Sequence, residues 1–217
     1  MRRALFNPFF LALAALLAPA LCYAQGDSAL RTRLRQVEAD PALSAAALKA
    51  GAKTAEFCAN CHGRNGQSLT ADTPHLAAQL PAYMLTQMQL FIEGRRRHEF
   101  MQGLLKAMSV DEKVNVALYF SRQPLAAQAS SDPTHMELAA HGKRYYDQIC
   151  FRCHGAQGRG ADQVPRIAGQ QEAYMKLTLK RYRDGSAVRA DPMMAESTRL
   201  MSDADIDAVA AHVAGMK

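Results

Sequence analysis

The sequence contains no tryptophan, and aromatic residues make up only 7% of its 217 positions. Bulky aromatic side chains therefore fill little of the interior, and the 11 methionines are another source of large apolar side chains. Glycine and proline, with 13 and 9 residues, are too few for a collagen-like or low-complexity chain. A globular protein of this length forms one large domain or two domains of about 100 residues each.

Long hydrophobic runs are also missing, because after residue 24 no segment approaches the roughly 18 consecutive apolar residues of a membrane-spanning helix. At the start of the chain, Arg2 and Arg3 precede an apolar run over residues 9–18, and small residues follow. This order is typical of a secretory signal peptide. We therefore predict a signal peptide over residues 1–24, export to the periplasm and no transmembrane anchor in the mature chain. Peripheral association with the membrane stays open.

Five cysteines cannot all pair with one another, because five is an odd number. Cys22 falls within the predicted signal peptide, where the preceding Pro-Ala-Leu makes a poor lipidation signal. The other four form two pairs, each followed at once by a histidine: Cys58-Ala-Asn-Cys61-His62 and Cys150-Phe-Arg-Cys153-His154. Disulfides are the ordinary use of cysteine in an exported protein, so any other use has to be argued from the pattern.

The two cysteine motifs belong to a longer internal repeat. They lie 92 residues apart, and further identical or similar residues recur at separations between 91 and 93. The matched pairs are Pro74/Pro165, Gln79/Gln170, Tyr83/Tyr174, Phe91/Tyr182, Gly94/Gly185, Met101/Met194 and Met108/Met201. A tandem duplication with copies of about 90 residues follows.

The repeat sets the expected domain organisation. A stretch rich in Pro, Ala, Gln and Ser separates the two copies and is typical of a linker. We predict an N-terminal extension at 25–42, a first domain at 43–122, the linker at 123–133 and a second domain at 134–217.

The coarse pattern within each copy is helical, and no segment alternates as a strand does. One helix is expected to lead into each cysteine motif, and a longer one to follow the glycine-rich stretch behind it. The final helix of each copy is expected to start at Ser109 and Ser202, because acidic residues follow each serine. The expected helices begin near Leu43 and Met136, run over 82–93 and 173–184, and end with those that start at the two serines.

The Cys-x-x-Cys-His pattern is the attachment signature of c-type haem. Two thiols three residues apart on a helix can form thioethers with the two vinyl groups of one porphyrin, and the next histidine then lies under the iron. In a four-cysteine zinc site the two cysteine pairs are usually separated by far fewer than 92 residues, and such a site does not require a histidine directly after each pair. A thioredoxin-like motif would need a βαβ context. The sequence therefore predicts two covalently bound haem c groups, on Cys58 and Cys61 and on Cys150 and Cys153.

His62 and His154 are the predicted proximal iron ligands, and the repeat narrows the search for the distal ones. The remaining histidines have no counterpart in the other copy, which favours surface positions for all of them: His75, His98, His135, His141 and His212.

Three methionine pairs do match between the copies. Met84/Met175 lie on the middle helix and Met108/Met201 directly precede the serine cap, positions that favour packing. Met101 and Met194 each lie eight residues before that serine, in segments predicted to be irregular, from which a side chain can reach the haem face. We predict them as axial ligands; Met193 is the nearest rival, with Phe100 as its counterpart. Ligation by His and Met raises the reduction potential of the haem relative to ligation by two histidines, which suits an electron carrier.

At this point the chain resembles a tandem class I dihaem cytochrome c of the cytochrome c4 type, over roughly residues 45–217. The segments that carry the resemblance are Pro74-His-Leu-Ala-Ala-Gln79 and Pro165-Arg-Ile-Ala-Gly-Gln170, besides the haem motifs. It implies an all-α fold of two class I cytochrome c domains, each a small helical bundle around one covalent haem. It also implies that the Pro74 and Pro165 carbonyls accept the Nδ1 protons of the haem histidines, and that the axial methionines lie before the serines.

The formal net charge of +6 does not indicate nucleic-acid binding, because export makes that partner implausible and haem propionates add negative charge. The densest basic cluster is Arg95-Arg96-Arg97. A solvated turn is the simpler interpretation, and docking of an acidic redox partner is the alternative.

The function predicted from these observations is a non-enzymatic periplasmic electron carrier. Its partners would be a quinol-oxidising complex (quinol–cytochrome c reductase) or a dehydrogenase as donor, and a terminal oxidase or other acceptor. Iron with two protein ligands offers no open position to a substrate. The alternatives are a dihaem redox enzyme, of peroxidase or thiosulfate-oxidising type, and a cytochrome subunit of a dehydrogenase complex.

Overall fold

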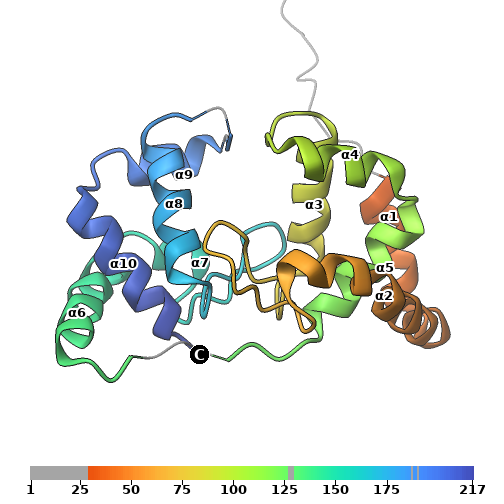
Figure 1. Ribbon diagram of the computed structural model, residues 1–217, viewed down its shortest axis with the longest axis horizontal. Helices are drawn as coiled ribbons and strands as arrows, with labels where there is room; N and C mark the ends of the chain where they lie inside the picture. The colour runs from red at the N-terminus through yellow and green to blue at the C-terminus, as the bar shows by residue number, and fades with distance from the viewer. Residues whose placement is uncertain (1–28, 127–129, 187, 190) are drawn as a thin grey trace, which may run out of the picture.

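The computed structural model describes residues 29–126, 130–186, 188–189 and 191–217 (Figure 1). The predicted signal peptide and part of the predicted linker lie outside these residues. The described part confirms the all-α prediction, since it contains helices and a single isolated bridge between Ala161 and Val164. None of its helices is long and apolar enough to cross a membrane. The helices are α1 (Ala29–Ala39), α2 (Pro41–His62), α3 (Pro81–Ile92), α4 (Glu99–Ala107), α5 (Val110–Ser121), α6 (Pro133–Gln148), α7 (Phe151–His154), α8 (Glu172–Arg183), α9 (Pro192–Thr198) and α10 (Asp203–Gly215).

The helices form two groups that correspond to the two copies of the repeat (Figure 1). In the first group α2 packs against α5, and in the second α6 packs against α10. Both crossings are close because a glycine lies at the contact. A Cβ atom on Gly51 would lie 2.1 Å from the Asn115 carbonyl oxygen, and one on Gly142 would lie 1.9 Å from that of Ala208. Each half therefore has the same pair of tightly crossed helices.

The last helix of each half starts at the serine predicted from the sequence. The Ser109 and Ser202 hydroxyl oxygens each accept a hydrogen bond from the backbone amide three residues later, and the Glu112 and Asp205 carboxylates each accept one from the backbone amide of the serine. These are complete capping boxes, which satisfy amide groups that a helix leaves unpaired at its start. They fix where α5 and α10 begin, and they confirm that prediction.

The described part of the predicted N-terminal extension, from residue 29 onward, contributes to the core of the first half. It contains α1, which packs against α5, α2 and α3. Leu30, Leu34 and Val37 are buried in the core of the first half, because they recur at three- to four-residue intervals along one face. Arg31 also reaches across to Asp162 in the second half, at 3.0 Å.

The helix leading into the haem motif differs between the halves. In the first half α2 runs without a break through both cysteines to His62. In the second half α6 ends at Gln148, so a helix leads into the motif there too, as predicted, but the motif itself lies on the separate short helix α7. The Tyr146 hydroxyl spans this break and donates to the Gly155 carbonyl at 2.6 Å, with the ring fully buried.

Loops, rather than helices, join the two halves at the centre of the molecule (Figure 1). The Gln170 side chain accepts from the His75 amide at 2.8 Å and donates to the His75 carbonyl at 3.1 Å. In the opposite direction, Gln79 accepts from the Arg166 amide at 2.9 Å and donates to the Arg166 carbonyl at 2.8 Å. The same contact is therefore made twice, once by each half on the other.

Candidate haem-binding sites

Both haem motifs lie at the end of a helix, and the chain turns away directly after the histidine. The turn is made by Gly63 and Gly155, whose φ angles of 78° and 76° lie in the left-handed region that favours glycine. Cys61 and Cys153 are exposed, while Cys58 and Cys150 are half-buried against the cores of their halves. No disulfide joins these four cysteines.

The two motif histidines are oriented in the same way. The distance from His62 Nδ1 to the Pro74 carbonyl oxygen is 3.0 Å, and that from His154 Nδ1 to the Pro165 carbonyl oxygen is also 3.0 Å. A carbonyl acceptor places the proton on Nδ1 and leaves the Nε2 lone pair free for a metal. The contacts that the resemblance implied are thus present in both halves.

Each imidazole is also kept neutral. Burial lowers the pKa of His62, with a further decrease from the nearby charges of Arg96 and His98, and the hydrogen bond to Pro74 only partly opposes this. Burial likewise lowers the pKa of His154. A neutral ring is the form that ligates iron, so both histidines are prepared for that role.

The first thiol of each motif is suited to thioether formation rather than to zinc binding. Burial raises the pKa of Cys58, and it raises that of Cys150 to about 11. Zinc binding and disulfide exchange both require the thiolate, whereas a thioether forms by net addition of S–H across a vinyl double bond. Within the described residues no group of three or more His, Cys, Asp or Glu side chains is placed to hold a metal ion, which excludes the shared zinc site there.

Met101 and Met194 do not lie in irregular segments, so that expectation was wrong. They lie in the first turns of α4 and α9, where the side chains of His98 and Asp191 accept hydrogen bonds from their amides at 3.3 and 3.0 Å. The capping residues explain the difference, because a capped start allows a short helix where apolar periodicity is too brief to detect. His98 and Asp191 are therefore counterparts, although their chemistry differs.

The other methionines and histidines can be sorted by exposure. Met84, Met175 and Met201 are buried in the cores and Met108 packs against the first core, which confirms their assignment to packing. Met193 is 69% exposed, and its counterpart Phe100 is 56% exposed. The expectation of a surface position fails for His75, which is only 2% exposed because it lies at the contact between the halves.

The first half contains a cavity of about 490 Å³ beside its haem motif. This volume is within the usual range for ligand and cofactor sites. The lining is mostly apolar and includes Phe57, Cys58, Leu104 and Met108. Cys58 is the one motif residue that lines it, so the fit to a covalently bound porphyrin rests on the protonated thiol and the oriented histidine.

Comparison with known proteins agrees with this geometry. A family model described as cytochrome c matches residues 139–217. Cytochrome c4 of Thiocapsa roseopersicina is 35% identical over 180 residues, which cover 76% of this chain and 90% of the relative. The chain belongs to the cytochrome c4 family. It is accordingly a dihaem c-type cytochrome of electron transfer, with two covalently bound haem c groups.

Two further proteins are similar to this chain over most of its length. The crystal structure of reduced recombinant cytochrome c4 from Pseudomonas stutzeri superposes with a TM-score of 0.70 at 30% identity, covering 78% of this chain and 98% of that one. A protein of Thiomonas intermedia (strain K12) named thiosulfate dehydrogenase electron acceptor is 31% identical over 74% of this chain and 78% of its own length.

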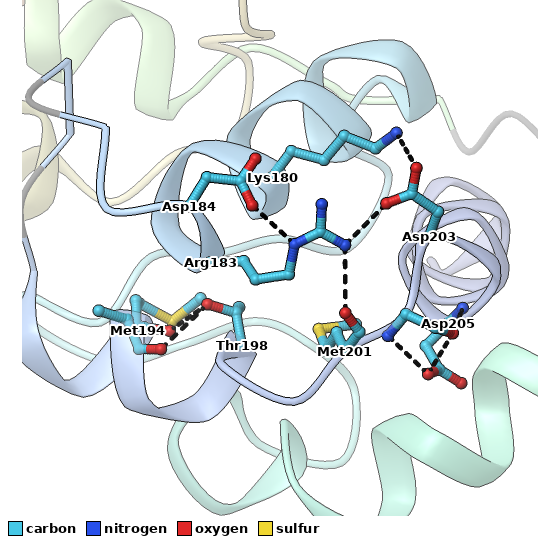
Figure 2. A network of polar contacts seen from close by, with 10 residues as sticks. Lys180, Arg183, Asp184, Met194, Thr198, Met201, Asp203 and Asp205 are labelled. Carbon is cyan, nitrogen blue, oxygen red and sulfur yellow. Dashed lines mark hydrogen bonds and ion pairs between the residues drawn. The ribbon is translucent and has the colours of Figure 1, made fainter.

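In this cytochrome c4 family member, the segment that carries Met194 is tied to α8 by polar contacts (Figure 2). Arg183 donates to the Met201 carbonyl at 3.1 Å and to the Asp203 carboxylate at 2.7 Å, and Lys180 reaches the same carboxylate at 2.9 Å. The Thr198 hydroxyl donates to the Met194 carbonyl at 2.8 Å. The connection from α9 to α10 is thereby held on both sides of Met201.

The structure gives roles to residues that sequence reasoning had noticed only as repeats. Gln79 and Gln170 hold the residues that directly follow Pro74 and Pro165, so each half supports the loop that orients the histidine of the other. Their matched spacing was the available signal. The arginine triplet is not a uniform surface cluster, because Arg96 turns inward to Gln87 and Tyr174.

Proposed function

We propose that the chain is a periplasmic electron carrier that takes electrons from a quinol-oxidising complex and passes them to a terminal oxidase or another acceptor. When bound, each haem iron supplies a one-electron couple. The chain's own residues hold that iron, exclude solvent from it and set its potential.

The proposal assigns one complete ligand set to each half. Cys58 and Cys61 with His62 hold the first haem, and Met101 is its distal ligand. In the second half the attachment residues are Cys150 and Cys153, and the iron ligands are His154 and Met194. What carries the assignment is the matched placement of the two methionines, each at the third position after a side chain that caps its helix.

The same ligand sets argue against an enzyme. A peroxidase or thiosulfate-oxidising centre needs an open position on iron or an unusual ligand such as cysteine. Each half supplies a matched methionine, and its two thiols are used for attachment. The proposed domains at 43–122 and 134–217 then act as two redox modules of a single carrier.

The test is the visible spectrum of the purified oxidised holoprotein and of single methionine variants. The wild type should show a weak far-red charge-transfer band, which the resemblance to cytochromes c with His/Met ligation implies. Met101→Ala and Met194→Ala should each remove about half of it, since each residue ligates one of two irons. Met193→Ala, at an exposed neighbouring position, is the control and should leave the band intact. A high-spin wild-type spectrum would favour the enzyme alternative.

A thiosulfate-oxidising enzyme is a second candidate for the electron donor. The relative from Thiomonas intermedia carries the name thiosulfate dehydrogenase electron acceptor, and it matches most of this chain. With this donor the chain would still be an electron carrier, and only the source of its electrons would differ.

Stopped-flow reduction separates the two donors. The oxidised protein is mixed with a purified quinol-oxidising complex plus quinol, or with a purified thiosulfate dehydrogenase plus thiosulfate. The proposed donor should reduce it faster, and the rate should fall as ionic strength rises if charge steers the encounter. Faster reduction by the second enzyme would replace the proposed donor.

Export is tested separately, because the signal peptide lies outside the described residues. The mature protein recovered from a periplasmic fraction should lack residues 1–24, and its intact mass should include two haem groups. A full-length chain in the cytoplasmic fraction would contradict the proposed location.

A further inference from the structure

The cavity of the first half lies between α2, α4 and the start of α5, and its lining combines apolar and charged side chains. From α2 it receives Lys53, Phe57 and Cys58, from α4 Leu104, and from α5 Glu112. The two proposed iron ligands of this half are not in the described lining. The cavity is therefore separate from the positions that the iron uses.

Cys58 connects the cavity with the proposed haem. Its sulfur is one of the two atoms that attach the porphyrin under Proposed function. A group that occupies the cavity is then in contact with an attachment residue, and it displaces neither iron ligand. Electron exchange between proteins requires such an approach and no open position on iron. The place of the cavity thus suits a contact with a redox partner.

Two phenylalanine rings add exposed apolar surface on the helices that line the cavity. Phe57 and Phe100 are each 56% exposed. Phe100 lies one turn before Leu104 on α4, and residues four apart share a face of a helix. Exposed apolar surface of this kind is typical of protein interaction sites, whose centres are enriched in aromatic residues.

The second half has a polar residue at the matching position of α9. Ser197 is the third residue after Met194, as Leu104 is the third after Met101. The Ser197 hydroxyl donates to the Met193 carbonyl at 2.8 Å. The apolar wall that Leu104 provides is therefore specific to the first half.

The start of the last helix is also held differently in the two halves. In the second half, His141 Nε2 of α6 lies 3.6 Å from the carboxylate of Asp205, the acidic residue of the α10 capping box. Glu112 has the same place in α5, but among the described residues it forms no ion pair with α2. The contact that bridges α6 and α10 is thus missing between α2 and α5, where Glu112 lines the cavity.

The charge that the cavity offers to a partner is positive. Lys53 lines it, is exposed, and forms no ion pair with any other residue that the structure describes. The Glu112 carboxylate, in contrast, accepts hydrogen bonds from the Ser109 amide and hydroxyl, both at 2.8 Å. A carboxylate on a partner would therefore meet a cation beside an apolar wall.

We propose that the cavity, together with Phe57 and Phe100, is the docking face of the first half for a redox partner protein that presents an apolar side chain next to a carboxylate. A protein fits better than a small molecule, because more than half of each ring is exposed and only a broad surface covers both. The partner exchanges electrons through the first haem. This inference rests on the electron-carrier role under Proposed function and adds the half at which the partner binds.

The test is steady-state electron transfer between the holoprotein and two purified partners, a quinol-oxidising complex with quinol and a terminal oxidase. Phe57→Ser and Leu104→Ser, the latter introducing the residue of the second half, should each raise KM about tenfold with at least one partner, because central interface residues dominate binding. The value of kcat should stay unchanged, and Phe57→Leu should retain most of the wild-type KM. The matched controls are Leu69→Ser and Leu200→Ser, at positions 98% and 78% exposed outside the cavity, which should leave KM unchanged.

The charge of the docking face is tested by Lys53→Gln. This variant should react more slowly at low ionic strength and should depend less on ionic strength than the wild type. Arg152→Gln removes the same charge from an exposed position of the second half and is the control. A KM that no variant changes, or that the controls raise equally, would overturn the docking face.

A measurement on the wild type needs neither partner nor variant. The compound 4-phenylbutyrate combines an apolar ring with a carboxylate, and in ¹H–¹⁵N spectra of the holoprotein it should shift the amide signals of Phe57 and Leu104 but not that of Ser197. Absence of these shifts would refute the chemistry given to the cavity. Shifts combined with partner kinetics that ignore the variants would show a small-molecule site and overturn the docking face. A wild type that reacts with neither partner is a failure of the proposed function, and the probe then still decides on the cavity.

Discussion

The two halves share one fold but are stabilised by different means. The first half has an additional helix, α1, which buries Leu30, Leu34 and Val37 in its core. The second half has no counterpart of α1 among the described residues and carries several ion pairs between α8 and α10, on Asp203 (Figure 2) and on Asp207, whereas α1 and α5 of the first half share one, Arg33–Asp111. Apolar burial depends little on salt and pH, whereas exposed ion pairs depend on both. The halves should therefore respond differently to the same change of conditions.

The largest expected effect concerns the glycine at the helix crossing, which both halves have. Gly51→Ala and Gly142→Ala should each destabilise their own half by about 3 kcal/mol or more, because the new methyl group would meet a carbonyl oxygen of the crossing helix. Guanidinium unfolding is followed by the far-red band in a Met194→Ala background, which reports the first half, or in a Met101→Ala background, which reports the second.

The control for the glycine variants is Gly103→Ala. This glycine lies within α4, and a Cβ atom there would have nothing within 4 Å. The substitution should stabilise the first half by about 0.5–1 kcal/mol, because alanine loses less backbone entropy in a helix. Equal effects of the three substitutions would show that the crossings are looser than described.

The next effect should destabilise the first half alone. Leu34→Ala removes a buried side chain of α1 and should destabilise the first half by about 2–3 kcal/mol while leaving the second unchanged. The same unfolding measurement checks it. Thr32→Ala, on an exposed position of the same helix, is the control. A loss spread over both halves would mean that α1 stabilises the whole molecule.

A smaller effect is confined to the second half. Tyr146→Phe leaves the Gly155 carbonyl without its hydroxyl partner and should cost about 1 kcal/mol. The matched position of the first half is Thr54, whose hydroxyl bonds only within its own helix. Thr54→Val should therefore change little. Similar losses in both halves would remove the special role given to the break between α6 and α7.

The smallest effect is a response to acid. Burial of Glu172 would raise its pKa, but hydrogen bonds from Lys176 and His135 outweigh this and lower it. The pKa is thus lower in the folded than in the unfolded state, so the stabilisation is present above about pH 4.5 and is lost as the pH falls through the folded value. The second half should weaken first as the pH falls below about 4.5, as shown by its far-red band in the Met101→Ala background. Glu172→Gln should reduce the difference, and the ion pairs on Asp203 should retain part of it.

The sequence was informative wherever a feature occurs twice. The capped starts at Ser109 and Ser202 and the helices around the haem motifs follow from local chemistry, and the repeat identified both. The burial of α1 could not be read in this way, because it depends on a groove that only the folded first half provides. The helical placement of Met101 and Met194 was missed because their helices are short and depend on single caps.

The arginine cluster shows a different limit of sequence reasoning. Arg96 stands between two exposed arginines, and nothing local distinguishes it from them. Its counterpart, Arg189, is found only by moving the register from 91 to 93 residues after Gly94 and Gly185. Tertiary contacts with Tyr174 then decide that it turns inward.

The reciprocal glutamine contacts have a consequence for how the molecule is assembled. A contact in which Gln79 binds the second copy as Gln170 binds the first has the form of an isologous interface, the kind that joins the subunits of a two-fold symmetric dimer. The tandem chain thus resembles a dimer whose two subunits are covalently joined. The effective concentration of one half around the other is set by the connecting segment and not by the protein concentration. Dilution that would dissociate two separate subunits leaves this pair together.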